Sequence, residues 1–267
     1  MNLSLQGKRA LICGSTQGIG FAIAKELALL GAHCVLMARN ESSLQAALQE
    51  LDVSQNQQHQ YLIADFTDHT TVQNAVQQLL TQEPISILIN NTGGPPAGPI
   101  VQAQTDDFLY AIHLHLINNH LLATGLLEGM KKVNYGRIIN IVSTSVKIPL
   151  ANLGVSNTTR AAVAAWAKTF ANEVAPFGIT VNNVLPGATS TVRLSSIIEN
   201  KSSKTNTSRQ EIECEMLHEI PMKRFGKPEE IAALAGFLAT PAASSNSSRR
   251  SSGLADKINS TRPCCIT

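Results

Sequence analysis

Short apolar runs alternate with longer amphipathic segments along most of the chain. The first run, Arg9–Cys13, precedes a segment, Ile19–Leu30, whose apolar residues recur every three or four positions, as on a helix with one buried face. Further runs of strand character lie at His33–Met37, Tyr61–Ala64, Ile85–Asn90, Arg137–Val142 and Ile179–Leu185. Helical patterns lie between them, near 41–51, 68–80, 105–130 and 155–175.

This alternation predicts an α/β fold of the Rossmann type, in which a doubly wound parallel sheet is the middle of three α/β/α layers. We expect residues 1–243 to form one nucleotide-binding domain. Ligands of such sheets bind beyond the carboxyl ends of the strands. Functional side chains are therefore expected directly after the apolar runs. The segment 190–219 is polar and rich in Lys and Ser, and we expect it to be a loop that closes over a substrate.

Composition excludes several classes of function. The chain has 267 residues with 43% hydrophobic and 15% charged residues, as in ordinary soluble enzymes. Its net charge of +2 creates no strong field for nucleic acid or an anionic membrane. No apolar run approaches the roughly 20 residues of a membrane span, and the start lacks the pattern of a signal peptide, so we expect a cytoplasmic protein. Five cysteines without a C-x-x-C pair predict neither disulfides nor a metal site.

A glycine-rich turn follows the first apolar run. Gly14, Gly18 and Gly20 have the spacing G-x-x-x-G-x-G and lie directly before a predicted helix. Glycine lets the backbone approach a pyrophosphate closely, and the start of a helix offers free N–H groups to it. A strand before the turn and a helix after it favour a dinucleotide site; the alternative is a turn without a ligand.

One position after the second run indicates which dinucleotide would bind. An acidic residue about 20 residues beyond the glycines binds the ribose of NAD, whereas an arginine suits the 2′-phosphate of NADP. Arg39 stands there with no acidic residue beside it. We therefore expect NADP rather than NAD, the alternative being that Arg39 is a solvated surface side chain.

Further motifs make the chain resemble the short-chain dehydrogenase/reductase family from about residue 5 to 243, with 3-oxoacyl-acyl-carrier-protein reductases as the most similar members. These motifs, in chain order, are Ala64–Thr67, Asn90–Gly93, Ile139–Ser143, Thr180–Asn182 with Pro186–Gly187, and Arg224–Ile231. The resemblance and the glycine turn together predict these cofactor-binding residues: Gly14, Ser15, Gln17, Gly18, Ile19, Gly20, Arg39, Asp65, Asn91, Gly93, Arg160, Pro186, Gly187 and Thr191.

The resemblance also implies four catalytic positions, of which three are changed. Such enzymes move a hydride between NAD(P) and a carbonyl or alcohol, using a serine, a tyrosine, a lysine four residues later, and an asparagine. Ser143 matches the serine, but Ser156, Arg160 and His115 stand at the positions of the tyrosine, lysine and asparagine. An aliphatic hydroxyl is a far weaker acid than a phenol. Arg160 stays charged but offers donors to the ribose.

Two roles stay open for His115. Histidine has an ordinary pKa near neutrality, so His115 is a candidate to replenish a proton at the altered site. The alternative is a histidine that only packs in its helix with His113 and His120.

The altered set leaves two interpretations of the whole protein. The first is an NADP-dependent oxidoreductase that reduces a ketone or a 3-oxoacyl thioester on an acyl carrier. The second is a catalytically impaired NADP-binding homologue that acts as a sensor or partner. In both we expect no nucleic-acid or membrane partner, and the resemblance implies a homodimer or homotetramer.

The end of the chain departs from the family. Residues 244–267 are rich in serine and show no strand-like alternation, so we expect a tail without packed structure and a sheet whose final strand is missing or altered. Natural divergence and a reading-frame change both remain open as the cause. The last four residues, Cys264–Thr267, have the form of a prenylation motif, but no Lys-rich run precedes them and we expect no lipid anchor.

Overall fold

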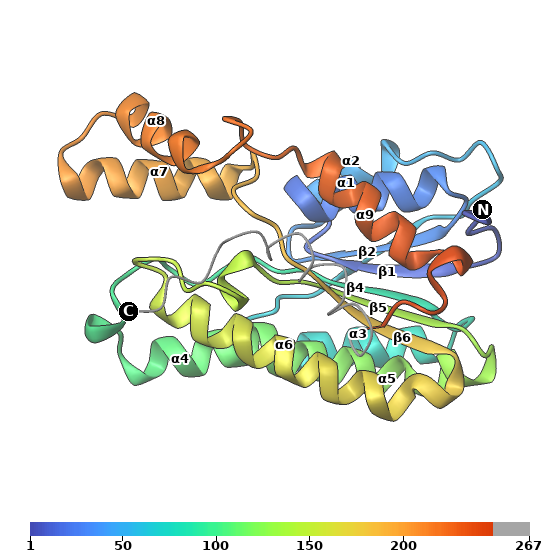
Figure 1. The fold of residues 1–267 in the computed structure, drawn as a ribbon. Helices are drawn as coiled ribbons and strands as arrows, with labels where there is room; N and C mark the ends of the chain where they lie inside the picture. The colour runs from blue at the N-terminus through green and yellow to red at the C-terminus, as the bar shows by residue number, and fades with distance from the viewer. Residues whose placement is uncertain (248–267) are drawn as a thin grey trace, which may run out of the picture.

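The apolar runs form a parallel sheet at the centre of the protein (Figure 1). The computed structural model describes residues 1–247, and within them six strands lie in the order β3-β2-β1-β4-β5-β6. The strands are β1 (Arg9–Cys13), β2 (His33–Ala38), β3 (Gln60–Ile63), β4 (Ile87–Asn90), β5 (Gly136–Ile141) and β6 (Ile179–Val184). This order and the parallel pairing confirm the predicted Rossmann-type fold.

Helices cover both faces of the sheet (Figure 1). One face carries α1 (Gly18–Leu29), α2 (Glu41–Gln49) and α9 (Pro228–Ala239). The other carries α3 (His69–Leu80), α4 (Thr105–Ile112), α5 (Asn118–Lys132) and α6 (Gly154–Val174). A further pair, α7 (Val192–Thr205) and α8 (Arg209–Glu219), projects beyond the sheet. No helix of the described residues is long and apolar enough to cross a membrane.

The strands are apolar on both sides because each side meets a helical layer. Along β1, Leu11 packs into the core under α3, α5 and α6, whereas Ile12 packs into the core under α1 and α9. Both side chains are fully buried. Such strands read as continuous apolar runs rather than alternating ones, which is why their positions could be predicted from the sequence.

The winding of the chain reverses at β1. This strand pairs with β2 on one side and with β4 on the other, so the connections after β1 and β4 leave in opposite directions. A crevice opens at the carboxyl ends of strands at such a reversal. The glycine turn after β1 and the loop after β4 therefore face each other across it.

The predicted helix over 105–130 is interrupted. Between α4 and α5 the chain makes a π-helical segment, His113–Ile117, which carries His115. Such wide turns inside helices often occur at functional sites. The polar/apolar pattern runs through the segment without a break, so the sequence gives no sign of it.

The segment 190–219 was expected to be a loop, and this is wrong. Thr191 caps α7 by accepting a hydrogen bond from the Leu194 backbone N–H, and Ser208 forms a reciprocal capping box with Glu211 at the start of α8. Leu194, Ile198 and Ile212 form a small buried core between the two helices. The capping signals outweigh the low apolar content that favoured a loop.

The chain beyond α9 turns back along the edge of the sheet. The Asn246 carbonyl accepts a hydrogen bond from the Asn182 side chain at 2.9 Å, and the Ser247 hydroxyl lies 3.4 Å from the backbone N and O of Val181. The first residues of the predicted tail thus lie beside β6, where they form no strand. The rest of that tail, including Cys264–Thr267, lies outside the described residues.

Three asparagines link the last strands of the sheet near their carboxyl ends. The Asn90 amide donates to Asn140 at 2.8 Å, and the Asn140 amide donates to Asn183 at 2.9 Å. The three residues are paired in register on β4, β5 and β6. Asn140 is fully buried; its bond to Asn90 is buried, and its bond to Asn183 is partly buried.

Replacing Asn140 should therefore destabilise the sheet. Asn140→Leu removes both bonds and leaves the Asn90 amide buried without an acceptor, so the free energy of unfolding should fall by about 2 kcal/mol. Urea unfolding followed by circular dichroism measures the change. Asn74→Leu, on the exposed side of α3, is the matched control and should have little effect. An equal loss of stability in both variants would contradict a stabilising role for the three linked asparagines.

Candidate functional site

The glycine turn after β1 has a backbone that only glycine adopts easily. Gly14 and Gly18 have φ of 57° and 56°, in the left-handed region. A Cβ on Gly14 would lie 2.6 Å from the Asn91 carbonyl oxygen, and one on Gly20 would lie 2.2 Å from the Gly14 carbonyl oxygen. Neither position has room for a side chain, so the turn packs tightly against the start of α1.

Asn91 holds this turn from across the crevice. It follows β4, and its side-chain amide donates to the carbonyl oxygens of Cys13 and Gly14, both at 3.2 Å. The contact fixes the end of β1 against the end of β4. The start of α1, with its free N–H groups and positive dipole end, is thereby aimed into the crevice.

A cavity of about 670 Å³ runs along the carboxyl ends of the strands. Most of the predicted site residues line it: Gly14, Gln17, Gly18, Ile19, Arg39, Asp65, Asn91, Gly93, Ser143, Ser156, Arg160, Pro186, Gly187 and Thr191. The structure does not place Ser15, Gly20 or His115 in its lining; all three are buried behind it. Residues far apart in the sequence thus meet in one space at the predicted edge of the sheet.

One end of the cavity carries Arg39 and Asp65, which follow β2 and β3. Hydrogen bonds from the backbone N–H and hydroxyl of Thr67 hold the pKa of the Asp65 carboxyl below its ordinary value, and the charge of Arg39 acts in the same direction. Asp65 is therefore ionised at neutral pH. Arg39 is exposed, and its guanidinium is available to a ligand.

The other end carries the positions of the expected catalytic residues. Ser143 follows β5, and its hydroxyl accepts a hydrogen bond from the Ser145 backbone N–H at 3.1 Å. Ser156 and Arg160 lie one turn apart on α6, so both face the cavity. Arg160 donates to the Ile141 carbonyl oxygen at 2.8 Å. Burial, with a smaller contribution from Arg193, lowers the pKa of Arg160 to about 10. This pKa is still well above 7, so Arg160 is charged at neutral pH.

His115 is buried behind this end, and its pKa is not near neutrality. Its Nδ1 lies 2.8 Å from the Thr92 hydroxyl, while its Nε2 has no hydrogen-bond partner among the described residues. Burial, followed by the charges of Arg160 and Arg193, holds the pKa of His115 well below its ordinary value. The ring is therefore neutral at pH 7. His113 and His120 are both exposed, so the burial of His115 sets it apart from the other two histidines of this segment.

Three residues at this end are not among the predicted site residues. Thr92 and Gly94, in the loop after β4, and Arg193, in the first turn of α7, all line the cavity. The Arg193 guanidinium donates to the Pro95 carbonyl oxygen at 2.6 Å, so it spans from α7 to the loop after β4. Because 190–219 was expected to be a loop, no direction could be predicted for the Arg193 side chain. The capping signal at Thr191 could have indicated that Arg193 lies in the first turn of a helix.

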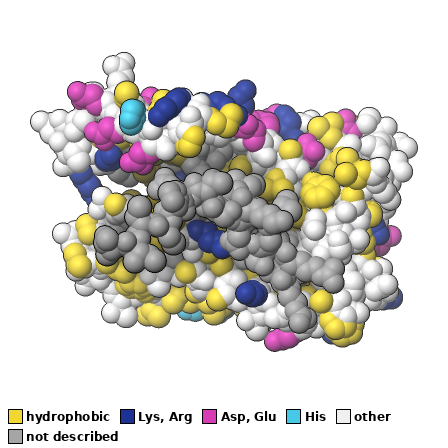
Figure 2. Space-filling view, viewed as in Figure 1, with side chains coloured by type: hydrophobic (Ala, Val, Ile, Leu, Met, Phe, Trp, Pro, Cys, Tyr) yellow, Lys and Arg dark blue, Asp and Glu magenta, His cyan; other side chains and the backbone are white. Residues whose placement is uncertain are grey.

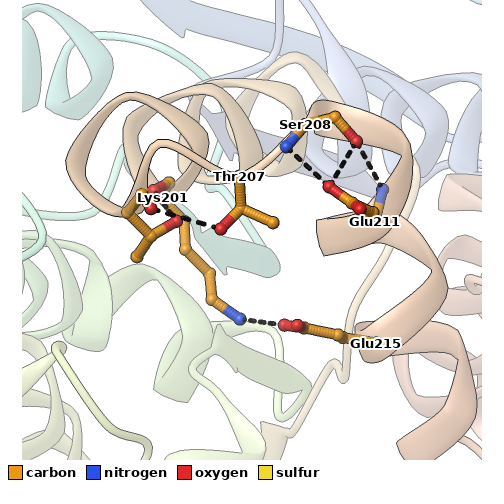
Figure 3. A network of polar contacts seen from close by, with 6 residues as sticks. Lys201, Thr207, Ser208, Glu211 and Glu215 are labelled. Atoms are coloured by element: carbon orange, nitrogen blue, oxygen red, sulfur yellow. Dashed lines mark hydrogen bonds and ion pairs between the residues drawn. The ribbon is translucent and has the colours of Figure 1, made fainter.

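The α7–α8 pair covers the cavity with a charged outer surface. Lys201 pairs with Glu215 at 2.8 Å, and Ser208 pairs with Glu211 (Figure 3). Figure 2 shows acidic and basic side chains side by side over these helices. Exposed pairs of this kind each contribute little to stability. The pair is therefore held by its small apolar core and helix caps, on the open side of the crevice.

The chain is similar in sequence to known proteins. A family profile described as short chain dehydrogenase matches residues 8–202. NADPH-dependent reductase BacG of Bacillus subtilis (strain 168) is 31% identical over 239 residues, 89% of this chain and 92% of BacG. The 3-oxoacyl-(acyl-carrier-protein) reductase FabG of Rickettsia bellii (strain RML369-C) is 32% identical over 240 residues, 89% of this chain and 91% of that protein.

Solved structures agree with the sequence matches. The crystal structure of L-sorbose reductase from Gluconobacter frateurii, complexed with NADPH and L-sorbose, superposes with a TM-score of 0.86 at 30% identity, covering 93% of this chain and 95% of that one. The fold and the cavity are those of a Rossmann-type nucleotide-binding protein. The chain belongs to the short-chain dehydrogenase/reductase family, which confirms the predicted resemblance.

The burial of neutral His115 predicts a pH dependence of stability. In the unfolded chain His115 regains its ordinary pKa of about 6.5. Below that pH the unfolded state binds the proton more readily than the folded state, so the free energy of unfolding should fall as the pH drops from about 6.5. His115→Gln should make this fall less steep in urea unfolding between about pH 6.5 and 5.

The exposed His113 provides the control. His113→Gln should leave the pH dependence of the natural protein unchanged. The same slope in the natural protein and in the His115→Gln variant would refute a buried neutral ring.

Proposed function

We propose that this protein is an NADP-dependent oxidoreductase that reduces the carbonyl of a small ketone or of a 3-oxoacyl thioester to an alcohol. The carrying observation is the continuous cavity that joins the glycine turn and Arg39 at one end to Ser143 at the other. The relatives named as NADPH-dependent and 3-oxoacyl reductases support both the direction of the reaction and the cofactor.

The residues present fit an NADP molecule. The glycine turn leaves no side chain between its backbone and the cavity, and the start of α1 suits the pyrophosphate. Arg39 suits the 2′-phosphate, and Asp65 suits the adenosine side. Arg160, Thr191 and the Pro186–Gly187 turn would hold the ribose and nicotinamide. When bound in reduced form, the cofactor supplies a hydride to the carbonyl carbon.

The chain's own residues must then deliver a proton to the carbonyl oxygen. The Ser143 hydroxyl donates a hydrogen bond to that oxygen, and the Arg160 charge stabilises the negative charge that develops on it. Neither group supplies a net proton at neutral pH. We infer that a water held by Ser143 and Ser156 gives this proton to the carbonyl oxygen, and that the hydroxide left behind is reprotonated from the solvent. A weak acid of this kind makes reduction slow. His115 is neutral, so it takes no part as a cationic donor.

The predicted assembly into homodimers or homotetramers stays a prediction. The outer face of α6 suits it, because Ala161 and Ala165 are exposed there and small side chains permit close approach of a second helix. Cytoplasmic location likewise stays a prediction.

The cofactor preference is tested at Arg39. NADPH should bind more tightly than NADH, and Arg39→Asp should weaken NADPH by about tenfold or more because a charge-assisted contact to the 2′-phosphate is lost. Fluorescence titration of both nucleotides measures this. Lys132→Asp, an equal change of charge at an exposed position of α5, should leave the preference intact. Equal affinities of the natural protein for NADPH and NADH would contradict the assignment of Arg39 to the 2′-phosphate.

Turnover is tested by restoring the residues implied by the family. The natural protein should oxidise NADPH slowly with a panel of ketones, and Ser143→Ala should abolish that activity. Ser156→Tyr combined with Arg160→Lys should raise the rate, because a phenol is a far stronger acid than an aliphatic hydroxyl. Absorbance of NADPH records each rate. If only the double variant turns over, the natural protein is a binding protein that acts as a sensor or partner.

A further inference from the structure

Two arginines at the Ser143 end of the cavity have no carboxylate partner within residues 1–247. Arg160 donates to the Ile141 carbonyl oxygen and Arg193 to the Pro95 carbonyl oxygen. By contrast, Arg209 and Arg224, on the exposed surface, both pair with glutamates. Carbonyl oxygens carry only partial charge, so the two guanidinium charges at the cavity are left uncompensated.

The charges along the cavity are unevenly distributed. Its charged lining residues in the described part of the chain are Arg39, Asp65, Arg160 and Arg193. The one carboxylate, Asp65, interacts with Arg39 at the far end. The Ser143 end therefore carries two positive charges and no negative one. Both arginine charges lower the pKa of His115, which agrees with their lying at the same end of the cavity.

The proposed cofactor does not account for Arg193. The phosphates of NADP have partners elsewhere, since the pyrophosphate fits the glycine turn and the 2′-phosphate fits Arg39. Arg193 reaches from α7 toward the loop after β4, where a Cβ on Gly94 would lie 3.2 Å from its Nη2. Arg160 lies across the same end, on α6 with Ser156. A substrate at Ser143 would therefore lie in the same cavity as both guanidinium groups.

We propose that Arg193 binds the carboxylate of the substrate, so that the protein prefers oxo acids to neutral ketones; Arg160, already assigned to the ribose and the carbonyl oxygen, adds only its charge to this end of the cavity. The proposal rests on the proposed function, because it names the substrate class of the same cavity. A guanidinium matches a carboxylate through two parallel hydrogen bonds. An anionic substrate would also relieve the repulsion between the two arginines, which a neutral ketone leaves in place.

The test compares an acid with its neutral ester, using binding rather than turnover. Benzoylformate and methyl benzoylformate carry the same ketone and differ by one charge. Calorimetry on the protein saturated with NADP⁺ should give the acid at least about tenfold tighter binding than the ester. Arg193→Gln should remove this preference and leave the affinity for NADP⁺ nearly unchanged. Lys204→Gln, which removes a charge from the other end of α7, should keep the preference.

Several results would overturn the proposal. Equal binding of acid and ester, binding of neither, or a preference that survives Arg193→Gln would each do so. Loss of NADP⁺ affinity in Arg193→Gln, in parallel with that for the acid, would assign Arg193 to the cofactor instead. Reduction of both probes is followed separately by NADPH absorbance. Preferential binding of the acid without turnover would refute the proposed reduction and leave the carboxylate site standing.

Discussion

The contact between Asn91 and the glycine turn is the constraint on which the cofactor end of this protein depends. The winding of the sheet reverses at β1, so the chain leaves β1 and β4 in opposite directions and opens a crevice between them. Asn91 ties the two strand ends together by donating to Cys13 and Gly14. The turn is packed so closely that neither Gly14 nor Gly20 has room for a Cβ. The backbone itself thus becomes the surface offered to a phosphate.

The opposite end of the cavity is lined by side chains that would contact the substrate, rather than by tightly packed backbone. Ser143 keeps the hydrogen-bond donor expected of the family, but the phenol and ammonium implied by the resemblance are replaced by Ser156 and Arg160. The site therefore carries fixed positive charge but lacks the phenol that would donate a proton. Neutral, buried His115 does not restore the missing acid. We propose that such a site favours negative charge, on a developing alkoxide or on a substrate carboxylate, and transfers protons slowly.

The sequence predicted the sheet and most of the candidate cofactor residues that line the cavity, because both depend on local signals. Strands buried on both faces appear in the sequence as apolar runs, and a glycine turn between a strand and a helix commonly binds a dinucleotide. The π-helical segment around His115 and the direction of Arg193 depend instead on tertiary packing. The lowered pKa of His115 comes from burial and from two arginines distant in the sequence, so periodicity could not reveal it. The α7–α8 pair was missed because its composition is polar, although its caps are readable.

The most direct measurement is the affinity for NADPH of two glycine variants. Gly20→Ala places a Cβ against the Gly14 carbonyl, whereas Gly98→Ala, in the loop after β4, meets no atom within 4 Å. If the packed glycine turn forms the cofactor site, Gly20→Ala should weaken NADPH binding by about tenfold or more while Gly98→Ala binds like the natural protein. Circular dichroism confirms that both variants are folded. Equal NADPH affinity in two folded variants would contradict the account.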